Sequence, residues 1–164
     1  PSYPTQQKSF LGIRGTWSDP YRQPPLSQAG ATVEGVAALD GVTLDPALAG
    51  GLSDLDETVS DYAGTGHRWM FALWRLPGLA YVTDSDTPQF LWDGDALDRN
   101  LRAIEEACLD RDPVVIVYRD PPAKAYREAL STSCGADFPE QWDDLGRVDL
   151  LGEPTQLVGL RGGG

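Results

Sequence analysis

The stretch that decides the fold is residues 97–119, LDRNLRAIEEACLDRDPVVIVYR. Its first half places Leu97, Leu101, Ile104 and Cys108 at spacings of four, three and four, the pattern of one buried helix face. Its second half, PVVIVYR, is a short apolar run typical of a strand that is covered on both faces. A helix followed by a buried strand predicts a sheet with helices packed on it.

The segments before this stretch predict further strands. The run HRWMFALWRL, residues 67–76, is too apolar to alternate and is typical of a second buried strand. Pro77-Gly78 predicts a turn into a third strand, LAYVT, at residues 79–83. A strand, a helix and a strand in this order almost always form a right-handed parallel crossover, so we expect such a unit over residues 79–119.

Two more helices are marked by signals at their ends. Ser53 is followed three residues later by Asp56, and Gly64 comes after the last turn of a segment that would bury Leu55, Val59 and Tyr62. Pro121-Pro122 predicts the start of a last short helix, which Gly135 would end. From Phe138 onward breakers are frequent, so we expect loop with one short strand. The pattern predicts an α+β or small α/β fold, with a mixed sheet of about four strands and three short helices.

Residues 1–51 differ in composition from the rest of the chain. Six prolines and frequent glycines interrupt short apolar groups, which predicts an extended arm with at most short strands. Within it, Asp40-Gly41 is typical of a hairpin turn. We therefore expect two units, an arm at 1–51 and a compact acidic body at 52–164 that ends in a flexible glycine tail.

The charge of the chain excludes some classes of partner. The formal net charge of −12 is uneven, because residues 1–35 carry +1 and the remaining 129 residues carry −13. A surface of this sign repels nucleic acid and anionic lipid, so we expect no direct binding to either. Other protein subunits with basic or apolar surfaces, in an oligomer or a hetero-assembly, are the expected partners.

The sequence also suggests where the protein works. The longest apolar run, WMFALW at residues 69–74, is far shorter than a membrane span. The N-terminus lacks the pattern of a secretion signal. Two cysteines, Cys108 and Cys134, cannot form a disulfide framework, and we expect both to be reduced. These observations favour the cytoplasm or a virion.

One acidic segment, YVTDSDTPQFLWDGDALD at residues 81–98, is a candidate metal site. We expect Asp95 and Asp98 to begin a helix, as its cap and in its first turn. This leaves Asp84, Asp86 and Asp93 as candidate ligands for Mg²⁺, Mn²⁺ or Ca²⁺, which prefer carboxylate oxygens. The alternative is that these aspartates only shape a turn and cap a helix.

The first seven residues of that segment resemble a known enzyme motif. YVTDSDT, residues 81–87, is similar to the strand followed by Asp-x-Asp in glycosyltransferases that bind a sugar nucleotide through a metal. The resemblance implies that Asp84 and Asp86 hold the metal. The segment also resembles the motif of haloacid dehalogenases, which places threonine four residues after the first aspartate. Thr87 is only three residues after Asp84, so the segment departs from that motif.

Other side chains give weaker signals. His67 is the single histidine, which excludes a site with two histidine ligands. We expect it to mark the beginning of a strand, and a dyad with Cys134 or a nearby serine is the alternative. Large apolar side chains in polar segments often contact a partner. The residues expected to do so are Phe90 and Trp92 in the acidic segment and Phe10 and Trp17 in the arm.

Three classes of function fit these features. The first is a non-enzymatic structural or adaptor subunit of a larger assembly, for instance a bacteriophage particle, anchored by its arm. The second is a metal-dependent transferase or hydrolase that uses Asp84 and Asp86 on a nucleotide or phosphorylated substrate. The third is an acidic inhibitor or immunity protein that covers a basic surface.

Overall fold

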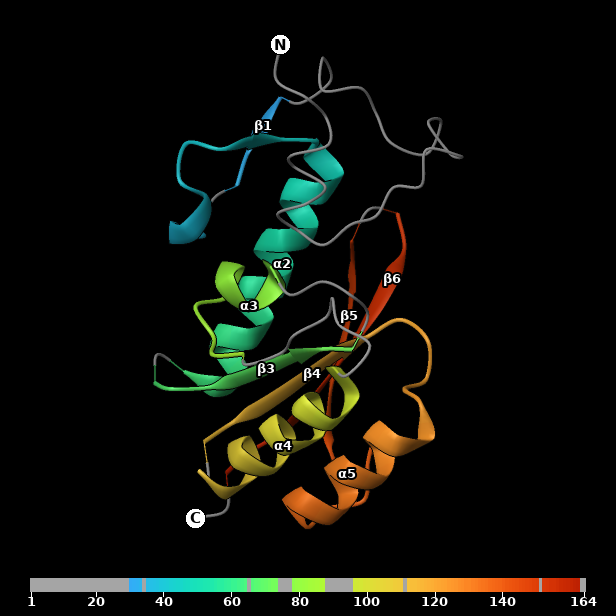
Figure 1. Cartoon of the computed structure of the whole chain (residues 1–164). Coiled ribbons are helices and arrows are strands. Elements are labelled where there is room, and N and C mark those ends of the chain that lie inside the picture. Colours follow the sequence, from blue (N-terminus) through green and yellow to red (C-terminus); the bar gives the residue numbers. More distant parts are fainter. Residues whose placement is uncertain are drawn as a thin grey trace.

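The computed structural model describes residues 30–33, 35–64, 66–73, 78–87, 96–110, 112–150 and 152–162 (Figure 1). In these residues a four-stranded mixed sheet lies between two layers of helices. Its strand order is β3-β4-β6-β5. The bounds of these strands are Trp69–Ala72 for β3, Val114–Tyr118 for β4, Asp143–Asp149 for β5 and Pro154–Leu160 for β6.

The predicted mixed sheet is confirmed. β3 and β4 are parallel, with Phe71 opposite Ile116, and β6 is antiparallel to both β4 and β5. The described residues contain four α-helices, one more than predicted. They are α2 (Pro46–Ala63), α3 (Gly78–Val82), α4 (Ala96–Leu109) and α5 (Lys124–Cys134).

The sheet separates two hydrophobic cores, because successive residues of a strand point to opposite faces. Val115 and Val117 of β4 belong to the core shared with α2 and α3. Val114 and Ile116 belong to the core shared with α4 and α5. Figure 1 shows the two helix pairs on opposite sides of the sheet. The prediction that the apolar run at 113–119 is a strand covered on both faces is therefore confirmed.

The predicted beginning of the first long helix is wrong. α2 begins at Pro46 rather than near Ser53, and the Asp45 side chain caps it by accepting hydrogen bonds from the N–H groups of Ala47 and Leu48 at 3.0 and 3.2 Å. Proline is well suited to a first helical position because it lacks only an N–H that would be unpaired there. The predicted end is confirmed, since Gly64 follows the last turn with φ of 71°.

The predicted third strand, LAYVT, is also wrong. Residues 78–82 form the short helix α3, whose Leu79, Ala80 and Val82 side chains are buried. The parallel pair is therefore β3 with β4, and the connection between them contains α3 and α4. A five-residue apolar run fits a buried helix as well as a buried strand, which explains the error.

The single short strand expected after Phe138 is wrong in number and length. This region forms two antiparallel strands of seven residues, β5 and β6. A bulge lies between Asp144 and Gly146, where the glycine has φ of 90°. A glycine and three aspartates make β5 atypical of a strand, and its pairing partner is what holds it in the sheet.

The turn predicted at Asp40-Gly41 is present, but the two strands it was expected to join directly are separated by a longer connection. β1 (Ala31–Thr32) pairs antiparallel with β2 (Thr43–Leu44), and a short 3-10 helix, η2 (Ala37–Leu39), precedes the turn. Gly41 has φ of 73°, a conformation that suits glycine. The predicted arm residues before Gly30, including Phe10 and Trp17, lie outside the described residues. No helix in the described part of the chain is long and apolar enough to cross a membrane.

Candidate functional site

The predicted metal ligands do not follow a strand. Asp84 lies two residues after the end of α3 and has φ of 48°, and Asp86 lies beside β3. The backbone of Asp86 accepts a hydrogen bond from the N–H of Met70 and donates one to the carbonyl of Arg68, both at 2.9 Å. Asp86 therefore covers part of the open edge of β3. Asp93, Phe90 and Trp92 lie outside the described residues.

His67 connects the segment after α3 to the segment before β4. Its Nε2 lies 2.6 Å from a carboxylate oxygen of Asp86, and its Nδ1 lies 2.7 Å from one of Asp112. The ring edge also packs on Trp69 at a centroid distance of 5.5 Å. The side chain remains 48% exposed. His67 thus lies two residues before the beginning of β3 rather than at it, and it contacts two carboxylates that are distant in the sequence.

Arg68 anchors the turn that carries Asp84. Its guanidinium is buried, with 6% of the residue exposed, and donates hydrogen bonds to the carbonyls of Thr83 and Gly64 and to Ser85 Oγ. These bonds tie the end of α2 to the end of α3. A buried guanidinium needs several acceptors, which here are supplied mainly by backbone carbonyls.

Asp56 of α2 lies in the electrostatic field of the same turn. Burial raises the pKa of the Asp56 carboxyl, the positive charge of Arg68 opposes this change, and the negative charge of Asp84 adds to it. Asp84 therefore interacts with Asp56, whereas Asp86 interacts with His67. Within the described ranges, no group of three or more His, Cys, Asp or Glu side chains is placed to hold a metal ion. The metal site that includes Asp93 stays a prediction.

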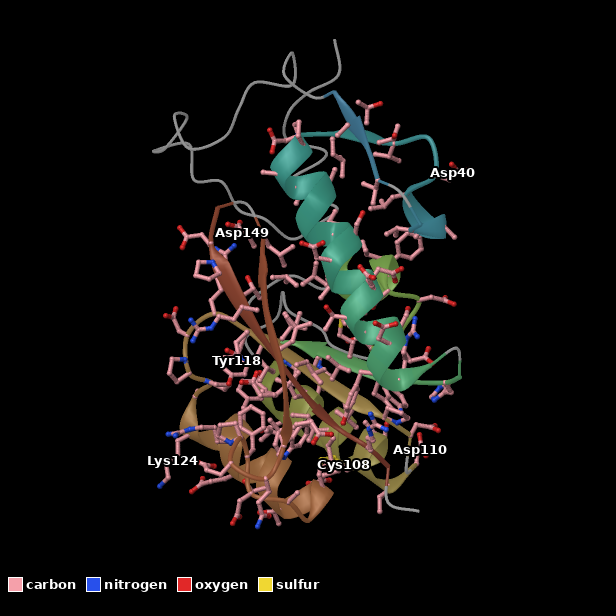
Figure 2. All side chains as sticks on the ribbon, turned by 180° about the vertical axis from the view of Figure 1, so that it is seen from behind. Asp40, Cys108, Asp110, Tyr118, Lys124 and Asp149 are labelled. Carbon is pink, nitrogen blue, oxygen red and sulfur yellow. A yellow bond between two sulfur atoms is a disulfide. The ribbon has the colours of Figure 1, made fainter. Side chains whose placement is uncertain are left out.

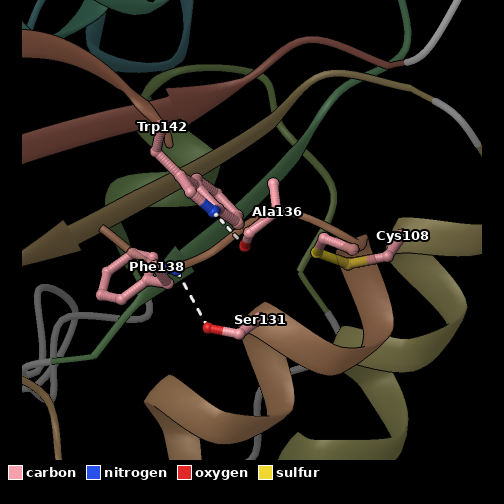
Figure 3. The surroundings of a disulfide bond; sticks show 6 residues. Cys108, Ser131, Ala136, Phe138 and Trp142 are labelled. Atoms are coloured by element: carbon pink, nitrogen blue, oxygen red, sulfur yellow. Dashed lines mark hydrogen bonds between the residues drawn. A yellow bond between two sulfur atoms is a disulfide. The ribbon is translucent and has the colours of Figure 1, made fainter. Parts of the chain in front are cut away.

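The expectation that the two cysteines are reduced is wrong. Cys108, near the end of α4, and Cys134, at the end of α5, form a disulfide with their Cα atoms 4.8 Å apart (Figure 3). The two positions are 26 residues apart in the chain, so no local motif predicts their pairing. The alternative of a His67–Cys134 dyad is thereby excluded.

α2 packs along β5, on the face of the sheet opposite α4 and α5. Near one end of β5 the backbone of Gly51 contacts the carbonyl oxygen of Asp149, and at the other end the Tyr62 hydroxyl donates a hydrogen bond to Asp143 Oδ2 at 2.9 Å. Figure 2 shows α2 crossing in front of the sheet, with Asp149 beside its first half. The contact at Gly51 requires glycine, since a Cβ would overlap that carbonyl.

This arrangement joins two acidic elements into one surface. α2 contains four acidic residues and no basic residue, and β5 contains three aspartates and one arginine. We call the exposed acidic residues of α2 together with Asp143 of β5 the acidic face. Its members are Asp54, Glu57, Asp61 and Asp143. The side chains of Asp144 and Asp149 point to the other face of the sheet, since Asp144 accepts a hydrogen bond from Gln156 and Asp149 lies between the buried Val148 and Leu150.

The two helices on the opposite side of the sheet have a balanced charge. α4 and α5 together contain four acidic and four basic residues. Among the long helices of the described residues, the acid excess therefore lies in α2. The sequence contained this signal, because all four acidic residues of α2 lie in the helix predicted from Ser53 to Gly64, which contains no lysine or arginine.

Tyr62 and Arg161 form the end of the acidic face. The guanidinium of Arg161 lies over the Tyr62 ring at 5.0 Å from its centroid and 3.9 Å from Asp143 Oδ2. Burial and then the hydrogen bond to Asp143 raise the pKa of Tyr62, so its hydroxyl keeps its proton and remains a donor. Tyr62 is therefore a fixed link between α2 and β5.

Comparisons with known proteins do not assign a family. No protein-family model matches the chain, and no curated protein and no solved structure is significantly similar to it. The function is therefore inferred from the charge distribution and the contacts of the described residues.

Proposed function

We propose that the protein is a non-enzymatic structural or adaptor subunit, and that its acidic face binds a partner protein with a basic surface. The observation that carries this proposal is the difference in charge between the helices on the two sides of the sheet. α2 has four acidic residues and no basic one, whereas α4 and α5 are balanced. A charge confined to one side orients an approaching partner and raises the rate of specific association.

The rigidity of the acidic face supports the same function. Its two elements are joined near both ends, by Gly51 against Asp149 and by Tyr62 with Asp143. Charges on a rigid surface keep a defined spacing, which favours a complementary pattern of lysine and arginine over non-specific attraction. A preorganised surface also loses less conformational entropy on binding.

The state of the reactive side chains also supports a non-enzymatic role. Cys108 and Cys134 are joined to each other, and both ring nitrogens of His67 face carboxylates. Nucleophilic catalysis requires a thiolate or a hydroxyl beside an available base. In the described residues the two cysteine sulfurs are bonded to each other, and the His67 ring nitrogens contact Asp86 and Asp112.

A pair of charge variants tests the proposal. Asp54→Asn/Glu57→Gln/Asp61→Asn removes three negative charges from the acidic face, and Asp98→Asn/Glu105→Gln/Glu106→Gln removes three from exposed positions of α4. The partner is first isolated from extract of the source cells with the wild-type chain as bait, and its Kd for each variant is then measured at several salt concentrations. We expect the first variant to weaken binding by roughly tenfold and to reduce the salt dependence.

The α4 variant is the matched control, because it changes the net charge by the same amount. We expect its Kd to stay within about twofold of the wild-type value, since surface charges that lie away from the interface contribute little to affinity. Equal weakening by the two variants would show that only net charge matters. Unchanged binding by the first variant would show that the partner docks elsewhere, and either result would contradict the proposal.

A further inference from the structure

The helices α4 and α5 are linked at two levels. Near their beginnings, Asn100 Nδ2 donates a hydrogen bond to Tyr126 Oη at 3.0 Å. Near their ends, the disulfide joins Cys108 to Cys134. The two links are eight positions apart in each helix, so the helices run parallel and side by side over about 12 Å.

α5 has little other anchorage to the body. Leu130 is its one fully buried residue, although the helix has eleven residues. The segment that follows depends on the position of its end, because the N–H of Phe138 donates to Ser131 Oγ at 2.9 Å (Figure 3). The indole N–H of Trp142 in turn donates to the carbonyl of Ala136 at 3.2 Å. The disulfide therefore holds the point where α5 leads into the Phe138 and Trp142 contacts.

We infer that the Cys108–Cys134 bond is a redox-sensitive latch, which a dithiol reductant opens to release the end of α5 from α4 while the sheet stays folded. Both cysteines are partly exposed, so an incoming thiolate can reach a sulfur atom. The reductant's thiolate attacks one sulfur and forms a mixed disulfide, and its second thiol then displaces that cysteine. The S–S bond of the protein gains two electrons and two protons to give two thiols, and the dithiol becomes a disulfide.

Reduction of the bond would expose a specific apolar surface of α4. Ile104 and Ala107 of α4 are buried in the same core as Leu130. When the end of α5 moves away, the side of α4 around Ala107 loses its cover, while Asn100 and Tyr126 still hold the beginnings of the helices together. This surface lies on the opposite side of the sheet from the acidic face, so the latch acts independently of the proposed partner binding.

Hydrogen exchange of the full chain, measured by mass spectrometry with and without dithiothreitol, tests the latch. The reduced sample is checked by thiol alkylation for complete reduction. We expect the amides of residues 128–134 to exchange at least roughly tenfold faster after reduction, and to become less protected than the amides of α2 and β4, which exchange only when the whole fold opens.

Three results would overturn the inference. The first is unchanged exchange in α5 although both thiols react with the alkylating agent. The second is a loss of protection in α2 and β4 as complete as that in α5, which would mean that the bond holds the whole fold together. The third is a bond that dithiothreitol cleaves only in denaturant, because a latch must open in the folded protein.

Two variants complete the experiment. Cys108→Ser/Cys134→Ser should show the fast α5 exchange of the reduced wild type with and without dithiothreitol. Asn100→Ala keeps the disulfide, so the end of its α5 should stay protected until the reductant is added. If the double variant does not fold, the reduced and alkylated wild-type chain gives the same comparison.

Discussion

The ring of Tyr62, near the end of α2, lies directly on the backbone of Gly159 in β6. A Cβ atom at position 159 would overlap the ring, so this contact requires glycine. The same tyrosine donates a hydrogen bond to Asp143 of β5. One side chain thus sets the distance of α2 from the two C-terminal strands, and with it the spacing of the acidic face.

Replacing Gly159 with alanine should therefore destabilise the protein. We expect Gly159→Ala to lower the free energy of unfolding by about 1–3 kcal/mol, because the added methyl group must displace either the Tyr62 ring or the strand. Urea unfolding followed by tryptophan fluorescence measures the change. Gly66→Ala is the control, since no atom lies near its Cβ position and its φ suits alanine. Equal effects of the two substitutions would contradict this account of Gly159.

Loss of the disulfide should lower global stability. A bond between residues that are 26 positions apart restricts the unfolded chain, and the chain-entropy estimate for such a loop is about 3 kcal/mol. We expect guanidinium unfolding of reduced and alkylated protein to show a lower midpoint than that of oxidised protein. Coincident unfolding curves would contradict a stabilising role for the bond.

How far the sequence predicted the fold depended on how local each signal was. The helix at α4 and the strand at β4 follow from their own residues, through the spacing of Leu101, Ile104 and Cys108 and through an apolar run. The end of α5 follows from Gly135, which adopts the left-handed conformation that ends helices. These elements were predicted because their signals require no distant partner.

The wrong predictions have distant causes. Gly50-Gly51 looked like part of an arm, but the absence of a side chain at Gly51 is what lets α2 approach the carbonyl of Asp149, nearly a hundred residues later. β5 is held in the sheet by its pairing with β6 rather than by its own composition. The contacts of His67 with Asp86 and Asp112, and the disulfide, likewise join residues that no local pattern connects.

The effect of Asp56 on stability should depend on pH. Burial raises its pKa in the folded protein, so the folded state binds more protons than the unfolded state just above the ordinary aspartate range. Stability due to this group is therefore greatest at acid pH and falls as pH rises through that window. We expect Asp56→Asn to be more stable than wild type at pH 7 and to differ little from it near pH 4, as measured by thermal unfolding. If Asp56→Asn were stabilised more near pH 4 than at pH 7, the pKa of Asp56 would not be raised by folding.

Metal binding separates the proposed role from the enzymatic alternative. Because Asp86 is paired with His67 and so is not free to share a cation with Asp84, we expect calorimetry with Mn²⁺ or Ca²⁺ at about 1 mM to give no binding heat. The Asp84→Ala/Asp86→Ala variant should give the same result as wild type. Binding heat that disappears in this variant would instead support a metal-dependent enzyme.

The most direct test of the central claim is a hydrogen-exchange footprint of the chain in complex with its partner. The account predicts that exposed positions of α2 and the amides of β5 become protected in the complex, and that α4 and α5 keep the exchange rates of the free protein. The protection should weaken as salt is raised, because charge attracts the two surfaces. Protection confined to α4 and α5, with α2 and β5 unchanged, would contradict the claim that the acidic face binds the partner.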